Sequence, residues 1–192
     1  MKKVTFAQGS QLKKIKEETF EHCQKLEEIH IPDSVTQIEK GAFYYCRSLS
    51  KLTLGKKLEV IDNNAFEGCS SLKQIEIPDS VESIGEGAFT YCTSLEHVTI
   101  GNKLAYVAKS AFSWCNLTEI TWGDGIAKIG DSAFACNQKL TTVSIPDTVT
   151  ELEYKAFAGC VELSDIEIPD SVEAIGGYAF AVSYTHLTLP TT

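Results

Sequence analysis

The chain has 192 residues, of which 43% are hydrophobic and 22% are charged. This length suggests one domain, or two, and the hydrophobic fraction suffices for a packed core, which argues against a disordered chain. Acidic residues outnumber basic ones by 26 to 17, and the formal net charge of −9 argues against a nucleic-acid binder or an anionic-membrane binder. No apolar run approaches the roughly 20 residues of a membrane-spanning helix, so we expect no membrane insertion.

A phenylalanine recurs along the chain with a period of 23 residues, interrupted by a single step of 22. An alanine precedes it in seven of the eight cases, and Ile-Pro-Asp-Ser-Val or a variant of it recurs between the phenylalanines. The residues that mark the register are Phe20, Phe43, Phe66, Phe89, Phe112, Phe134, Phe157 and Phe180. Such a fixed period indicates a repeat protein, in which each unit buries its apolar side chains against its neighbours.

One repeat unit predicts a short strand followed by tight turns. Ile75 and Ile77 alternate with polar residues, as on one face of a strand, and Leu72 leads into it. Pro78 ends the strand because proline donates no ladder hydrogen bond. Apolar residues within 81–89 supply further inward-facing pairs. We therefore expect a solenoid with one short parallel strand per 23-residue turn, and irregular or 3-10 turns on the other face.

The Ala-Phe-x-x-Cys signature, as in Ala88–Cys92, and the Ile-Pro after the strand resemble the leucine-rich repeats of the BspA-like (Treponema pallidum type) family. The resemblance covers residues 1 to about 181. It implies a leucine-rich-repeat solenoid, an α/β-type repeat architecture. Members of that family are linked with the surfaces of host-associated bacteria and with adhesion to host matrix proteins and to other cells.

Both ends of the array depart from the repeat. We expect residues 1–181 to be a single array of about eight units that is truncated at both ends, with Met1 at the position of the repeat leucine. The loop 7–11 of the first unit is two residues longer than its counterpart 32–34. Residues 182–192 resemble the translation of a sequencing adaptor, so we expect a non-native tail; a divergent last repeat is the alternative.

Six of the seven cysteines occupy one repeat position, three residues after the phenylalanine. Stacked identical positions have parallel Cβ vectors, whereas a disulfide needs Cβ atoms about 3.8 Å apart, so disulfides are not expected. In the sixth unit Asn137 takes this position and Cys136 is displaced by one, which predicts a buried turn whose side chain bonds to backbone. Because the sequence has no Cys-x-x-Cys motif or Cys/His cluster, we expect no metal and no cofactor.

Nothing in the spacing marks a catalytic centre. The histidines fall in different repeat positions, and no Ser-His-Asp or Cys-His arrangement or phosphate-binding glycine loop stands out, so we do not expect an enzyme. The outward residues of the predicted strands form a candidate binding face of short polar and charged side chains, for which a solvated surface is the alternative. This strand face comprises Glu28, His30, Lys51, Thr53, Gln74, Glu76, His97, Thr99, Glu119 and Thr121.

A second candidate site is an edge stripe of aromatic residues. Tyr45, Tyr91 and Trp114 fall in turns just after the repeat phenylalanine, and aromatic residues are favoured at binding hot spots. Packing of these rings against the adjacent turn is the alternative.

The sequence leaves two hypotheses for the function of the chain. The first is a non-catalytic protein-binding module of a cell-surface or secreted adhesin-like protein, whose partner is a host matrix protein or a protein on another cell surface. The second is a passive structural spacer that displays a domain encoded elsewhere. The location at the cell surface or outside the cell follows from the resemblance alone.

Overall fold

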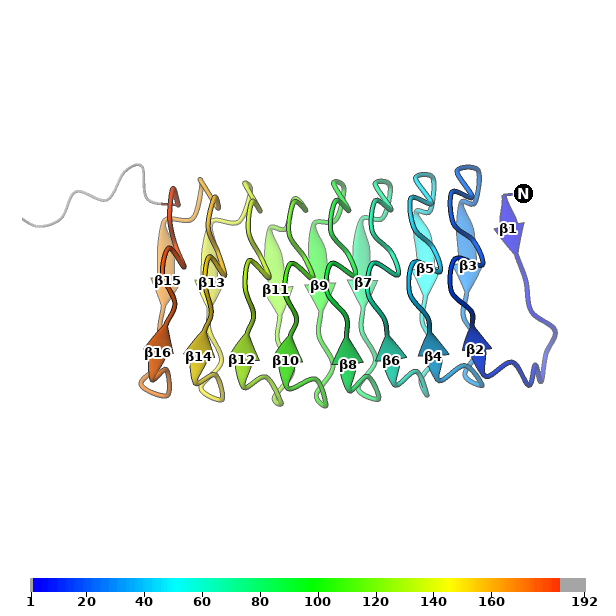
Figure 1. Cartoon of the computed structure of the whole chain (residues 1–192), viewed down its shortest axis with the longest axis horizontal. Coiled ribbons are helices and arrows are strands. Elements are labelled where there is room, and N and C mark those ends of the chain that lie inside the picture. Colours follow the sequence, from blue (N-terminus) through cyan, green and yellow to red (C-terminus); the bar gives the residue numbers. More distant parts are fainter. Residues whose placement is uncertain (1, 184–192) are drawn as a thin grey trace, which may run out of the picture.

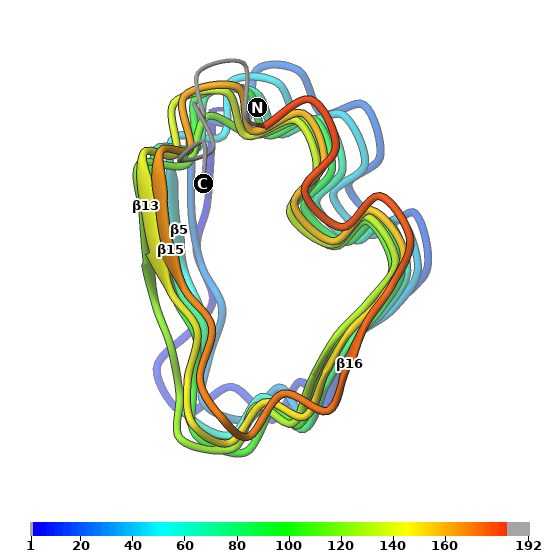
Figure 2. The same ribbon diagram turned by 90° about the vertical axis from the view of Figure 1, so that its left-hand side faces the viewer.

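The computed structural model describes residues 2–183, which form an elongated solenoid of stacked coils (Figure 1). Viewed along the long axis, successive coils have nearly the same outline (Figure 2). Each coil contributes two short strands, and these residues contain sixteen strands and no helix. The described chain accordingly offers no helix that is long and apolar enough to cross a membrane.

The first strand of each coil is the predicted one, and it runs parallel to its counterparts. β9 (His97–Thr99) lies between β7 (Gln74–Glu76) and β11 (Glu119–Thr121), with His97 opposite Gln74 and Glu119. This register follows the repeat and confirms the predicted parallel strand. The other members of the first ladder are β1 (Lys3–Val4), β3 (Glu28–His30), β5 (Lys51–Thr53), β13 (Thr142–Ser144) and β15 (Asp165–Glu167).

A second parallel ladder of two-residue strands, which the sequence interpretation did not include, crosses the other side of each coil. In β8 (Ser83–Ile84), Ile84 is buried and Ser83 is exposed, so the strand contains one of the predicted inward-facing residues. The other members are β2 (Lys14–Ile15), β4 (Gln37–Ile38), β6 (Val60–Ile61), β10 (Tyr106–Val107), β12 (Lys128–Ile129), β14 (Glu151–Leu152) and β16 (Ala174–Ile175).

The remaining segments are tight turns, as predicted. The resemblance also implied an α/β-type architecture, but the described residues contain no helix, so that part of the prediction does not apply. The reason lies in two left-handed residues per coil. In the third coil these are Asn64, with φ of 56°, and Gly68, with φ of 71°, on either side of Phe66. A right-handed helix needs negative φ throughout, so these two residues prevent helix formation around the phenylalanine.

The repeat phenylalanines form one continuous stack through the core. Rings in neighbouring coils lie 5.0–5.9 Å apart between centroids and within 15° of parallel. The six inner rings are fully buried, and so are the alanines that precede them. Because one coil alone would expose its ring, each coil depends on its neighbours for burial.

The cysteine position bonds to the backbone of the preceding coil. The Sγ of Cys92, for example, donates to the carbonyl oxygen of Phe66 at 3.3 Å. The fully buried Asn137 does the same with Nδ2, at 2.9 Å from the Phe112 oxygen, while its Oδ1 accepts the Leu117 N–H at 3.0 Å. These contacts confirm the predicted side-chain-to-backbone role, and the cysteines of the chain are free thiols.

Two residues of the expected tail lie within the described part. Ser183 is buried at the cysteine position, and its Oγ donates to the Phe157 carbonyl at 2.8 Å. Val182 is 69% exposed. Residues 184–192 lie outside the described residues.

The first ladder is interrupted twice. β5 and β7 lie side by side without ladder hydrogen bonds, as do β11 and β13, so the ladder consists of the sheets β1-β3-β5, β7-β9-β11 and β13-β15 (Figure 1). Leu52 and Ile120, at the centres of β5 and β11 beside the breaks, are partly exposed, whereas Ile75 in β7 and Val98 in β9 are buried. The strand face is therefore not uniformly bonded along the array.

Candidate interaction surfaces

The structure places the predicted strand-face residues in two columns, which the break between β5 and β7 divides. All of these side chains are exposed except that of Glu28, which is partly exposed. The aligned positions are Glu28 with Lys51, His30 with Thr53, Gln74 with His97 and Glu119, and Glu76 with Thr99 and Thr121.

Polar side chains on this face contact one another across neighbouring coils. Lys3 Nζ donates to Glu28 Oε1 at 2.8 Å, and this hydrogen bond holds the pKa of the Glu28 carboxyl below its usual value. His97 Nδ1 lies 3.5 Å from Glu119 Oε2. Surface pairs of this kind contribute little stability. The strand face as a whole carries short polar and charged side chains and no aromatic anchor.

The residues of the edge stripe differ from one another. The ring of Tyr45 lies against Gly68, where an added Cβ would stand 2.9 Å from the ring, and the guanidinium of Arg47 lies 5.2 Å from the ring centroid. Tyr45 is consequently half-buried. Tyr91 and Trp114 remain 43% and 48% exposed, and their rings stack with centroids 6.0 Å apart. We call these two residues the aromatic pair.

The aromatic pair stands on strained backbone. Tyr91 and Trp114 have φ of 58° and 55°, in the left-handed region. The same repeat position is left-handed in the other coils too, with glycine in some and a residue such as Cys136 in others. The left-handed conformation costs a non-glycine residue roughly 1–2 kcal/mol. Because a left-handed residue recurs at this position in every coil, the conformation belongs to the fold and is not special to the aromatic pair.

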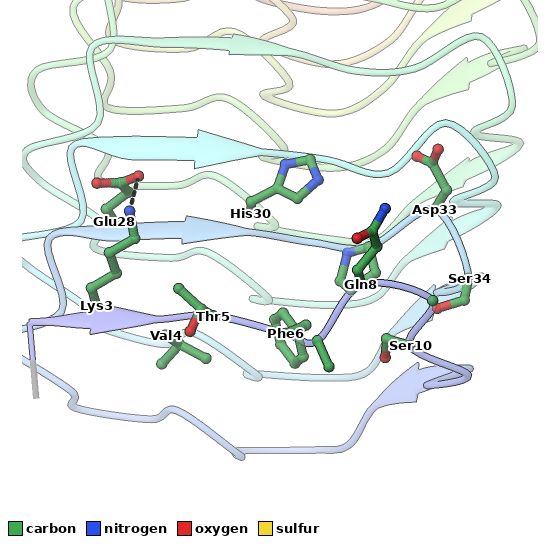
Figure 3. Close-up of a pocket in the computed structure, with 13 residues that line it drawn as sticks. Lys3, Val4, Thr5, Phe6, Gln8, Ser10, Glu28, His30, Asp33 and Ser34 are labelled. Carbon is green, nitrogen blue, oxygen red and sulfur yellow. Dashed lines mark hydrogen bonds and ion pairs between the residues drawn. The ribbon is translucent and has the colours of Figure 1, made fainter.

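A hollow of about 520 Å³ lies beside β1 and β3 (Figure 3). Its walls are the loop 7–10, the turn 32–34, the segment after β1 that includes Thr5, and strand residues such as His30. The Oγ of Ser34, which lines the hollow, is buried and has no hydrogen-bond partner within the described residues. We call this feature the Ser34 hollow.

The other titratable groups indicate structural roles. Within residues 2–183, no grouping of three or more His, Cys, Asp or Glu side chains is arranged to hold a metal ion. Burial raises the pKa of the Cys115 and Cys160 thiols to about 12. Because the thiolate is the reactive form of cysteine, these residues are inert at neutral pH.

Sequence reasoning missed the Ser34 hollow, whose one signal was the extra length of loop 7–11. It also grouped Tyr45 with the aromatic pair, because the sequence does not show that the Tyr45 ring covers Gly68 in the next coil.

Comparisons with known proteins agree with this geometry. The profile of the family described as BspA type Leucine rich repeat region matches in six copies, over residues 1–112 and 60–188. None of the curated proteins compared with the chain gives a significant match.

Three solved structures are similar. A leucine-rich repeat protein from Bacteroides ovatus is 26% identical with a TM-score of 0.79, over 88% of this chain and 44% of that one. One from Eubacterium ventriosum is 29% identical with a TM-score of 0.78, over 86% and 45%. The T. pallidum leucine rich repeat protein is 27% identical with a TM-score of 0.63, over 86% and 67%. The chain thus spans under half the length of two of them. It belongs to the BspA-type leucine-rich repeat family.

Proposed function

We propose that the chain is a non-catalytic protein-binding array of an adhesin-like protein that acts at the cell surface or after secretion. The observation that carries this proposal is the exposed aromatic pair of Tyr91 and Trp114. Tyrosine and tryptophan dominate binding hot spots, and they supply a large contact area at a low entropic cost.

The partner we propose is a host matrix protein or a protein on another cell surface, which is the kind of partner that the family resemblance implies. The net charge of −9 favours a partner with a basic surface, because complementary charge accelerates encounter. The strand face, with residues such as Lys51 and Glu76, would then supply polar contacts rather than the anchor.

The test uses surface plasmon resonance with the full chain over immobilised fibronectin, laminin and type I collagen. The double variant Tyr91→Ser/Trp114→Ser should bind at least tenfold more weakly, because truncating one hot-spot residue costs about 2 kcal/mol. The matched control is Tyr154→Ser, which removes a tyrosine that is 44% exposed in a different turn of the coil. Its affinity should equal that of the wild type.

Saturable binding that the double variant loses and the control keeps supports the proposal. Saturable binding that both variants keep refutes the role of the aromatic pair. If the wild-type chain binds none of fibronectin, laminin and type I collagen, the result favours the passive spacer, in which the repeats only display another domain.

A further inference from the structure

Ser34 lacks a hydrogen bond that its counterparts make. In the unit that contains Ser80, the serine Oγ donates to the Leu58 carbonyl of the preceding coil at 2.6 Å, and the same bond recurs in the last Ile-Pro-Asp-Ser-Val copy. The equivalent carbonyl for Ser34 belongs to Leu12, which follows the longer loop 7–11, and no such bond forms. A buried hydroxyl without a partner costs about 1–3 kcal/mol, and it therefore calls for an explanation.

The loop that deprives Ser34 of its partner also forms a wall of the hollow that Ser34 lines. A volume of about 520 Å³ lies within the range typical of small-molecule sites. A rotamer change at Ser34 would turn its hydroxyl toward a molecule in this hollow. Figure 3 shows Gln8 of the loop placed between His30 of β3 and Asp33 of the turn.

The lining consists of groups that both donate and accept hydrogen bonds. Thr5, Ser10 and Ser34 contribute hydroxyls, and Gln8 contributes an amide. Phe6 adds apolar surface. A ligand that carries several hydroxyl groups on a carbon ring matches this lining. Its hydroxyls can bond to the side-chain hydroxyls and the Gln8 amide, and its C–H groups can pack against Phe6.

The charges argue against an anionic ligand. Lys3, the basic residue of the lining, is paired with Glu28 at 2.8 Å. The Asp33 carboxylate would repel an anion, and its Oδ1 already accepts the Lys56 N–H at 2.7 Å, which fixes its position. Because Glu28 also lines the hollow and offsets Lys3, the Asp33 carboxylate leaves the lining with one net negative charge.

We infer that the Ser34 hollow binds a neutral sugar unit, either a free sugar or the terminal residue of a glycan. The Ser34 hydroxyl and the Gln8 amide bond to its hydroxyl groups. The site is independent of the aromatic pair, which lies in different coils.

The test is a titration of the ¹⁵N-labelled full chain, followed by two-dimensional NMR, with glucose, galactose, N-acetylglucosamine and their methyl glycosides. We expect at least one sugar to shift the amide signals of Gly9, Ser10 and Ser34 saturably, with a dissociation constant of the order of 1 mM. Ser34→Ala should weaken that binding at least fivefold. The matched control Ser80→Ala should leave it unchanged, because the Ser80 hydroxyl already has a backbone partner. Methyl glycosides that bind as well as the free sugars identify a glycan terminus as the source, whereas preference for the free sugars identifies a free sugar.

Three results would overturn the inference. The first is that no sugar shifts these signals. The second is that sodium acetate or arginine methyl ester shifts them while the sugars do not, because the ligand class would then be ionic. The third is that Ser34→Ala, with a circular dichroism spectrum like that of the wild type, binds the sugar with unchanged affinity.

Discussion

The continuous phenylalanine stack makes a specific prediction for Phe89→Ala. Phe89 is fully buried between Phe66 and Phe112, with both centroid distances equal to 5.2 Å. Each flanking ring is held by its own further neighbour, so neither can move far into the space left by the missing ring. Truncation of a core phenylalanine costs about 3–5 kcal/mol, and each lost stacking contact adds about 0.5–1.5 kcal/mol. We expect a loss of unfolding free energy of about 5 kcal/mol.

Urea unfolding of the full chain, followed by circular dichroism and by tryptophan fluorescence, measures this loss. The control is Phe20→Ala, since Phe20 is partly buried and its stacking partner among the described residues is Phe43, at 5.0 Å. The control should lose roughly half as much stability. A loss below about 1 kcal/mol for Phe89→Ala would refute the stacked core. Separation of the two probes would show that the variant unfolds in two parts, as repeat arrays do when neighbours uncouple.

Three further predictions concern side-chain hydrogen bonds between coils. Asn137→Ala should lower the unfolding free energy in urea by about 3 kcal/mol, because it leaves the Phe112 carbonyl without its Asn137 partner in a buried turn; Asn137→Cys, which restores the usual repeat residue, should lose less. Burial and the hydrogen bond to Glu153 raise the pKa of Tyr106 to about 12. A spectrophotometric titration should therefore show one tyrosine ionising about two units above the ordinary value of about 10, and Tyr106→Phe should abolish that step. Because the unfolded tyrosine ionises first, this contribution to native stability is present below pH 10 and is lost as the pH rises toward 12. In Gly130→Ala the new Cβ would stand 2.6 Å from the Tyr106 hydroxyl oxygen, so the same titration should show the Tyr106 pKa moving back toward 10.

The sequence predicted the features that repeat in every coil. The spacing of residues such as Phe66 and Phe89 determined the register, and the alternation of Ile75 and Ile77 predicted the parallel strand that the structure contains. The exchange of cysteine for Asn137 predicted a side-chain bond to backbone, and three such bonds involve that residue. These inferences succeeded because a period constrains all coils at once.

Features that depend on contacts between particular coils were harder to predict. The second ladder joins two-residue strands such as β8, which are too short to show alternation. The absence of helix in the described residues follows from left-handed residues such as Asn64, and no sequence rule required that conformation there. The exposure of Trp114 and the isolation of the Ser34 hydroxyl depend on what the neighbouring coil places opposite them, which a single unit does not reveal.

The central claim is that the aromatic pair is open to solvent in the free protein and covered by a bound partner. Acrylamide quenching of the Trp122→Phe variant measures this directly, because Trp114 is then the one tryptophan in the chain. We predict red-shifted, readily quenched emission from the free chain, and protection from quenching when a matrix protein that binds the chain is added. Blue-shifted and shielded emission in the free chain, or unchanged quenching in a saturated complex, would contradict the claim.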